Sequence, residues 1–216
     1  MNNIITEFDE LLEKQYPDVH CGLEAGDSPY RLLMMAILSA QCTDKRVNEV
    51  SHDLFARYPD MDSLAGCDIS DLEYYIKSCG LYRAKAKNMK ACAEMIVRDF
   101  NGQIPSAMDD LLKLPGVGRK IGNLVRGDIF MLGGIVADTH LIRISNRLGF
   151  ADSTDPYKVE RALTPHIPIE RQSAFCHRVV HFGREICSAR SPKCNQCFVG
   201  NAGLCHTLNN SREPKQ

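Results

Sequence analysis

Apolar residues recur along most of the chain at the three- and four-residue spacing of amphipathic helices. Residues 30–40 are mainly apolar, which is typical of a buried helix, and Pro29 suits the first turn of that helix. Residues 84–100 predict a long amphipathic helix that ends at Asn101-Gly102. No segment alternates apolar and polar residues with a period of two, so we expect almost no sheet. The pattern predicts an all-α protein.

The composition is that of a globular protein. The chain has 216 residues, of which 44% are hydrophobic and 25% charged. No apolar run approaches the roughly 18 residues that a membrane span needs. The first ten residues carry acids and lack the basic start of a signal peptide. We therefore expect a soluble intracellular protein with no membrane partner.

Charge is distributed unevenly, although the net charge is only −1. Residues 1–28 contain seven acids and one base, whereas residues 111–147 contain six bases and two acids. Such a distribution would allow one face to bind a polyanion, with a chance fluctuation of surface charge as the alternative.

A hairpin is predicted between two helical segments. Leu111 to Leu114 end a short helix, Pro115-Gly116-Val117-Gly118 form a turn, and a second helix begins at Arg119. Two glycines allow positive φ and a close approach of the backbone to a partner. Their amides at a helix start would suit a phosphate. A plain helix–turn–helix connection is the alternative, and the basic pair Arg119-Lys120 favours the phosphate site.

Two charged residues are candidates for chemistry. Lys120 falls in the first turn of the second helix, where the helix dipole and Arg119 disfavour an ammonium, although a solvated lysine is also possible there. Asp138 precedes another helix and suits an N-cap, and a carboxylate there could also accept a proton from an amine. His140 belongs either to the helix surface or to the surroundings of that carboxylate.

Four of the ten cysteines are clustered near the end of the chain. Cys187, Cys194, Cys197 and Cys205 follow the spacing Cys-x6-Cys-x2-Cys-x7-Cys. The spacing favours a [4Fe–4S] cluster, a four-cysteine zinc site remains open, and an intracellular setting disfavours disulfides. A metal would brace the basic loop 188–193, whose Arg190 and Lys193 could contact phosphates.

The ordered set of motifs resembles the endonuclease III family. The motifs are Leu114–Lys120, Val136–His140, the four cysteines, Leu38–Asp44 and Gly80–Ala86, and the resemblance covers the chain from about Pro29 to Cys205. It implies an all-α, two-lobed helix-hairpin-helix DNA glycosylase fold. One lobe is a six-helix barrel over residues 22–132, and the other joins residues 1–21 to residues 133–216 and carries a [4Fe–4S] cluster.

The resemblance also implies an activity and the residues that perform it. Lys120 is expected to be the nucleophile and Asp138 its carboxylate partner in a DNA glycosylase/AP lyase that removes oxidised pyrimidines through an imine. The partner is double-stranded DNA with damaged pyrimidines or abasic sites, bound by a monomer in a bacterial cytoplasm, near the nucleoid. Ser39 and Asp44 are expected at the lesion pocket. The expected DNA contacts are Gln41, Leu81, Gly116, Val117, Gly118, Arg119, His140, Arg143, Arg190 and Lys193, of which Gln41 and Leu81 fill or wedge the gap left by the extruded base.

The sequence departs from the family pattern at three places. The last cysteine gap is x7 where x5 is usual, so residues 198–204 should bulge, and residues 121–123 and 126–128 also differ. Gly122 should weaken its helix by roughly 1 kcal/mol relative to alanine. Three other functions stay open from the residues alone: a monofunctional glycosylase, a non-catalytic DNA-binding hairpin, and an iron–sulfur electron carrier.

Overall fold

The computed structural model describes residues 2–212, and no strand occurs within that range. The predicted all-α class is therefore confirmed. The chain divides into two units. We call residues 21–130 the hairpin unit, and residues 1–20 with 131–216 the cysteine-loop unit. None of the helices within the described range is both long and apolar enough to cross a membrane.

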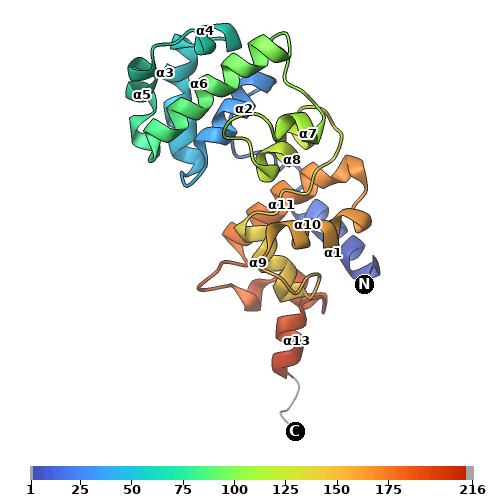
Figure 1. Ribbon diagram of the computed structural model, residues 1–216. Helices are drawn as coiled ribbons and strands as arrows, with labels where there is room; N and C mark the ends of the chain where they lie inside the picture. The colour runs from blue at the N-terminus through green and yellow to red at the C-terminus, as the bar shows by residue number, and fades with distance from the viewer. Residues whose placement is uncertain (1, 213–216) are drawn as a thin grey trace. The chain divides into compact units, whose positions relative to one another are not determined.

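The hairpin unit is a cluster of helices around a buried central one (Figure 1). Seven consecutive residues of α2, Leu32 to Leu38, are buried, which explains why this helix is apolar on all sides. Helices α4 and α5 pack on α6, and α7 packs on α8. The elements are α2 (Pro29–Leu38), α3 (Asp44–Arg57), α4 (Met61–Ala65), α5 (Ile69–Ile76), η1 (Lys77–Cys79), α6 (Tyr82–Asp99), α7 (Met108–Leu111) and α8 (Arg119–Asp128).

Side-chain caps fix where these helices begin. The Ser28 hydroxyl accepts from the amide of Arg31 at the start of α2, and the Thr43 hydroxyl accepts from the amide of Arg46 at the start of α3. Asp60 forms a capping box with Ser63 at α4. Each cap satisfies amides that have no partner within the helix, so the boundaries are encoded locally.

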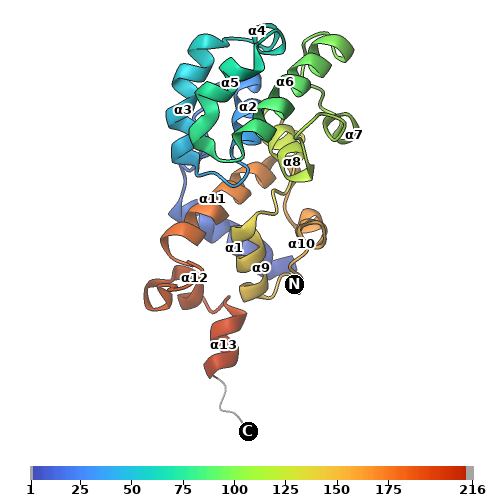
Figure 2. The same cartoon turned by 60° about the vertical axis from the view of Figure 1, so that its left-hand side comes forward.

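The cysteine-loop unit is built on α11, which packs against α1 and α9 (Figure 2). Its aromatic core places Phe8 of α1 with ring centroids 6.0 Å from both Phe175 and Phe182 of α11. The buried Arg178 and the half-buried Arg171 bind Glu13 of α1. The elements are α1 (Asn2–Gln15), α9 (Thr139–Leu148), α10 (Pro156–Leu163), η2 (Thr164–His166), η3 (Ile169–Arg171), α11 (Gln172–Glu185), η4 (Cys194–Gln196), α12 (Phe198–Asn201) and α13 (His206–Arg212).

Candidate active site and cysteine loop

The turn between α7 and α8 is held against the core of the hairpin unit. Val117 is buried, and its amide donates to the carbonyl of Leu114 at 3.0 Å. Gly116 has φ +80°, and a Cβ added there would lie 2.9 Å from Cβ of Asn88 and 3.3 Å from Cγ2 of Ile37. The turn therefore requires glycine at 116 both for its backbone angle and for its packing on α2 and α6.

The start of α8 offers backbone amides to an anion. Gly118 is the N-cap residue of α8, it is exposed, and it provides no side chain that could cap the helix. Among the described residues, the amides of Gly116 and Gly118 have no hydrogen-bond partner. A Cβ added at Gly118 would meet nothing within 4 Å, so the surface is open there. Partnerless amides at the positive end of a helix dipole form a site for an anion.

Lys120 is the second residue of α8, directly behind this turn. Lys120 and its neighbour Arg119 are both exposed. No hydrogen bond or ion pair engages the Lys120 amine within the described part of the chain. An amine in this position is accessible to an external electrophile, as a nucleophile must be.

Asp138, in the cysteine-loop unit, is the N-cap residue of α9. Its Oδ1 atom accepts from the amides of His140 at 2.9 Å and Leu141 at 2.8 Å. Its Oδ2 atom accepts no hydrogen bond from any residue that the structure describes, and the side chain is half-buried. The capping and the chemical interpretations of Asp138 are therefore compatible, because each uses a different oxygen atom.

Arg143 and His140 of α9 face α11. The Nη2 atom of Arg143 donates to the carbonyl oxygens of Gly183 at 3.1 Å and Cys187 at 3.0 Å, and lies 3.2 Å from Nδ1 of His140. Burial lowers the pKa of the Arg143 guanidinium. These contacts direct the guanidinium toward the cysteine loop, whereas we had expected a DNA contact from it.

Arg147, one turn further along α9, was not among the residues expected at the site. It donates to Sγ of Cys187 at 3.2 Å and to the carbonyl oxygens of Ser188 at 2.8 Å and Ala189 at 3.0 Å. The four-residue spacing from Arg143 places both guanidinium groups on one face of α9. That spacing is the signal in the sequence that could have identified Arg147.

All four clustered cysteines line a cavity of about 150 Å³. The amide of Gly200 donates to Sγ of Cys197 at 3.4 Å, and the x7 segment contains the short helix α12. No three of these sulfur atoms lie within 4.8 Å of one another. A single tetrahedral zinc with Zn–S bonds of about 2.3 Å would bring its sulfur atoms to about 3.8 Å. The wider spacing and the cavity fit a polyatomic group better than one ion.

The loop between Cys187 and Cys194 carries two exposed bases. Arg190 and Lys193 are both exposed, and neither forms an ion pair with any described residue. The amide of Lys193 donates to the carbonyl of Ile186 at 2.9 Å, which closes the loop at its base. The loop therefore presents two cations to solvent from a fixed backbone.

Gln41 and Leu81, in the hairpin unit, both have left-handed backbone angles, with φ of 54° and 46°. Both side chains are exposed, and Leu81 is exposed by 61%. The Ser39 hydroxyl donates to the carbonyl of Ala36 at 2.8 Å, and Asp44 is the half-buried first residue of α3. A leucine held at a left-handed backbone angle is strained, and such strain points to a role in binding.

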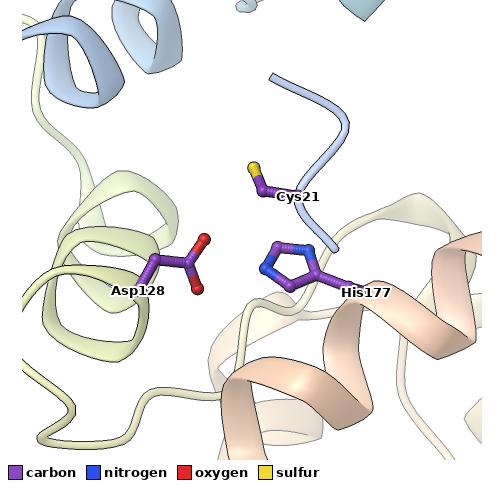
Figure 3. Close-up of side chains that lie close together, drawn as sticks. All are labelled: Cys21, Asp128 and His177. Carbon is purple, nitrogen blue, oxygen red and sulfur yellow. The ribbon is translucent and has the colours of Figure 1, made fainter. Parts of the chain in front are cut away.

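Cys21, the first residue of the hairpin unit, lies beside Asp128, the last residue of α8 (Figure 3). Burial raises the pKa of the Cys21 thiol to about 12, and a hydrogen bond to Asp128 adds to the rise. Figure 3 also draws His177, which belongs to the cysteine-loop unit.

Comparisons with known proteins place the whole chain in a family. Residues 34–168 match the family described as HhH-GPD superfamily base excision DNA repair protein. Endonuclease III of Synechocystis sp. is 44% identical over 201 residues, which are 93% of this chain and 90% of that protein. A non-covalent endonuclease III–DNA complex matches with a TM-score of 0.90, 39% identity and 99% of both chains. A trapped endonuclease III–DNA covalent intermediate matches with the same TM-score and coverage at 38% identity. The chain therefore belongs to the endonuclease III family of the HhH-GPD superfamily of base excision DNA repair proteins.

Proposed function

We propose that this protein excises oxidised pyrimidines from double-stranded DNA through an imine on Lys120 and then cleaves the abasic strand by β-elimination. Its class, a DNA glycosylase with AP lyase activity, follows from its membership of the endonuclease III family. One observation carries the assignment to Lys120. This exposed amine is in the first turn of α8, directly behind a glycine turn with partnerless amides.

The imine, and the strand cleavage that depends on it, require a primary amine. The Lys120 nitrogen bonds to C1′ of the damaged nucleotide as the bond between C1′ and the base breaks, and the departing base takes a proton. The nitrogen gives up one proton to that base, the C1′–O4′ bond breaks as O4′ takes a proton from solvent, and the nitrogen lone pair forms a protonated C1′ imine. The imine makes the C2′ hydrogen acidic, so loss of that proton expels the 3′ oxygen and cuts the strand. A hydroxyl group or water could not form this electron sink.

Asp138 is proposed to handle the protons. Its Oδ2 atom is the oxygen without a hydrogen-bond partner among the described residues, so it can accept a proton from the amine and stabilise positive charge on the sugar. Its Oδ1 atom meanwhile holds the first turn of α9. His140, whose amide donates to Oδ1, is proposed to contact DNA beside it.

The remaining expected contacts divide into phosphate and base contacts. Gly116, Val117, Gly118 and Arg119 are proposed to bind one phosphate through backbone amides and charge. Arg190 and Lys193 contact further phosphates, and Arg143 acts on DNA indirectly by holding their loop through the Cys187 carbonyl. Gln41 and Leu81 occupy the gap left by the extruded nucleotide, and Ser39 and Asp44 line the pocket that receives the damaged base.

The four cysteines are proposed to hold a [4Fe–4S] cluster. The spacing of their sulfur atoms, the cavity that they share, and the hydrogen bonds from Arg147 and Gly200 to sulfur fit such a group. When bound, the cluster would link the four positions and so fix the loop that carries Arg190 and Lys193. Equal amounts of iron and sulfide in the purified protein are expected, and one zinc per chain with no iron would refute this part.

Borohydride trapping tests the nucleophile. Wild type and Lys120→Ala are incubated with a duplex that contains one thymine glycol, and covalent protein–DNA bands are counted. A band from wild type alone is expected, whereas a Lys120→Ala variant that still traps and cuts would refute the assignment. An abasic duplex in parallel identifies a protein that is a lyase but does not act on this lesion.

Asp138→Asn and Asp138→Ala separate chemistry from capping. Asparagine is as good an N-cap as aspartate, whereas alanine costs about 1 kcal/mol at this position. Both variants should trap slowly, but only Asp138→Ala should lose thermal stability. Asp138→Asn with the wild-type trapping rate would limit Asp138 to capping.

Gel filtration of the DNA-free protein is expected to give a monomer.

A further inference from the structure

Lys85 is a buried lysine for which the reaction has no use. It lies on α6 and is 5% exposed, and no ion pair engages it within the described residues. Its Nζ atom donates to the carbonyl oxygens of Leu38 and Cys79, both at 2.7 Å. Burying an ammonium without a carboxylate partner costs folding free energy, because the charge loses its hydration. The presence of Lys85 in the core therefore requires a reason.

The two carbonyl groups belong to the ends of two helices. Leu38 is the last residue of α2, and Cys79 is the last residue of η1, which follows α5. The last carbonyls of a helix lack partners within it and carry the negative end of its dipole. One ammonium therefore caps two helix ends that are 41 residues apart in the sequence.

The segments that follow these two helix ends carry two of the four non-glycine residues with positive φ among the described residues, and both side chains are exposed. Gln41 comes three residues after Leu38, and Leu81 comes two residues after Cys79. Leu81 is also fixed by Lys85 itself, because the Lys85 amide donates to the Leu81 carbonyl at 3.1 Å. The Lys85 ammonium thus binds the backbone at the start of both segments, through the carbonyl oxygens of Leu38 and Cys79.

The surroundings of the Lys85 ammonium are apolar and closed. Burial raises the pKa of the Cys79 thiol to about 11, the adjacent Cys42 thiol adds to the rise, and the charge of Lys85 opposes it. Met89, Cys92 and Ile96, on the same face of α6, are fully buried. Lys85 therefore cannot reach a sugar and is not a second nucleophile.

We propose that Lys85 is a positioning residue for base extrusion, because its ammonium sets the spacing between the segments that present Gln41 and Leu81. The inference rests on the proposed function of those two side chains. Each has a left-handed backbone angle, and such strain persists only where the surrounding structure fixes it. Without the ammonium, both helix ends would retain unsatisfied carbonyls, and the two segments would separate or relax.

The test compares two reactions of the same protein. Base excision from a duplex with an intact damaged base requires extrusion, whereas cleavage at an abasic site in single-stranded DNA requires Lys120 but no wedge. Lys85→Met keeps the length and apolar stem of the side chain and removes its charge. It should lower excision by about 10- to 100-fold, the range expected for a misplaced positioning group, and leave single-stranded cleavage near wild type. Lys87→Met, on an exposed position of α6, is the matched control and should change both rates by less than about twofold.

Further variants make the result decisive. Gln41→Ala and Leu81→Ala should lower excision alone, and if neither does, the wedge assignment fails independently of Lys85. If both do while Lys85→Met retains wild-type excision, the positioning inference is wrong. If Lys85→Met does not fold, Lys85→Gln retains a donor and is measured in its place. Rates are normalised to the amount of protein that borohydride traps on abasic DNA, so equal losses in both reactions after this correction overturn the inference.

Discussion

Gly183 allows α11 to lie against the first turns of α9. We predict that Gly183→Ala displaces His140 and Arg143 of α9, and with them the neighbouring Asp138. A Cβ on Gly183 would lie 2.6 Å from Nδ1 of His140 and 2.9 Å from Nη2 of Arg143. The imidazole ring is rigid, and the guanidinium is held by the carbonyl of Cys187. Neither the His140 ring nor the Arg143 guanidinium can move away from a new Cβ without losing the contact between them or the hydrogen bond to Cys187.

The expected size follows from opposing effects. Alanine in place of glycine within a helix gains about 1 kcal/mol in propensity. Overpacking costs about 1–3 kcal/mol, and a lost hydrogen bond costs about 1 kcal/mol more. The net loss is about 1–3 kcal/mol, or roughly 2–12 °C in Tm for a chain of this length. Because His140 lies two residues from Asp138, imine formation should slow beyond any loss of folded protein.

Gly122→Ala is the matched control for this prediction. It gains the same helix propensity on α8. Its Cβ would crowd the flexible thioether of Met108, with Sδ at 2.8 Å, and would be in ordinary contact with Cβ of Leu111 at 3.9 Å. Its stability should stay within about 1 kcal/mol of wild type. Thermal unfolding followed by circular dichroism compares the two variants, and borohydride trapping compares their rates. Equal melting temperatures for Gly183→Ala and Gly122→Ala would refute the reasoning.

Three further predictions concern the turn, the cysteine loop and the N-terminal helix. Gly116→Ala should cost about 2–4 kcal/mol of stability from its left-handed φ and close contacts, whereas Gly118→Ala should keep stability in urea titrations and weaken DNA binding. If the proposed cluster is bound, Arg147→Met should shorten the lifetime of its visible absorbance under a mild oxidant, and an unchanged lifetime would contradict a role for the hydrogen bond from Arg147 to Cys187. Arg171 holds the pKa of Glu13 below its ordinary value of 4.5, so the stability that Glu13 adds is present above that pH and is lost as the pH falls through the lower folded value. Glu13→Gln should therefore melt earlier than wild type at pH 7, and the two curves should converge in acid.

Features that depend on neighbouring residues could be predicted from the sequence. The long helix at 84–100 is α6, Tyr82–Asp99, and the predicted stop at Asn101-Gly102 has positive φ at both residues. Asp138 is an N-cap, as its place before a helix predicted. Caps and stops need only a few residues of context, so a single sequence contains the information.

Features that join distant segments could not be predicted. The helix α11 was not predicted as an element, because its buried face includes Gln172 and Arg178, which interrupt the apolar pattern. Lys85 was assigned only to an amphipathic helix, although it lies four and eleven residues before the buried Met89 and Ile96. The sequence does not identify the two carbonyl partners of Lys85, because the ends of α2 and η1 come together only in the folded protein. The spacing of the cysteine sulfur atoms likewise comes from the folded loop.

The basic segment 111–147 illustrates why a charge count alone misleads. Four of its six bases are used within their own units: Lys113 pairs with Asp110, Arg126 donates to the Ser106 carbonyl, and Arg143 and Arg147 hold the cysteine loop. The charges proposed to meet phosphates are therefore few, mainly Arg119, Arg190 and Lys193, and backbone amides supply the rest. Because the salt dependence of binding scales as about −0.9 per neutralised phosphate, the slope for an uncleavable abasic analogue should be about −2 to −4. Arg190→Gln should reduce its magnitude by about one. A slope of −5 or steeper would mean that the inward-facing arginines reach DNA after all.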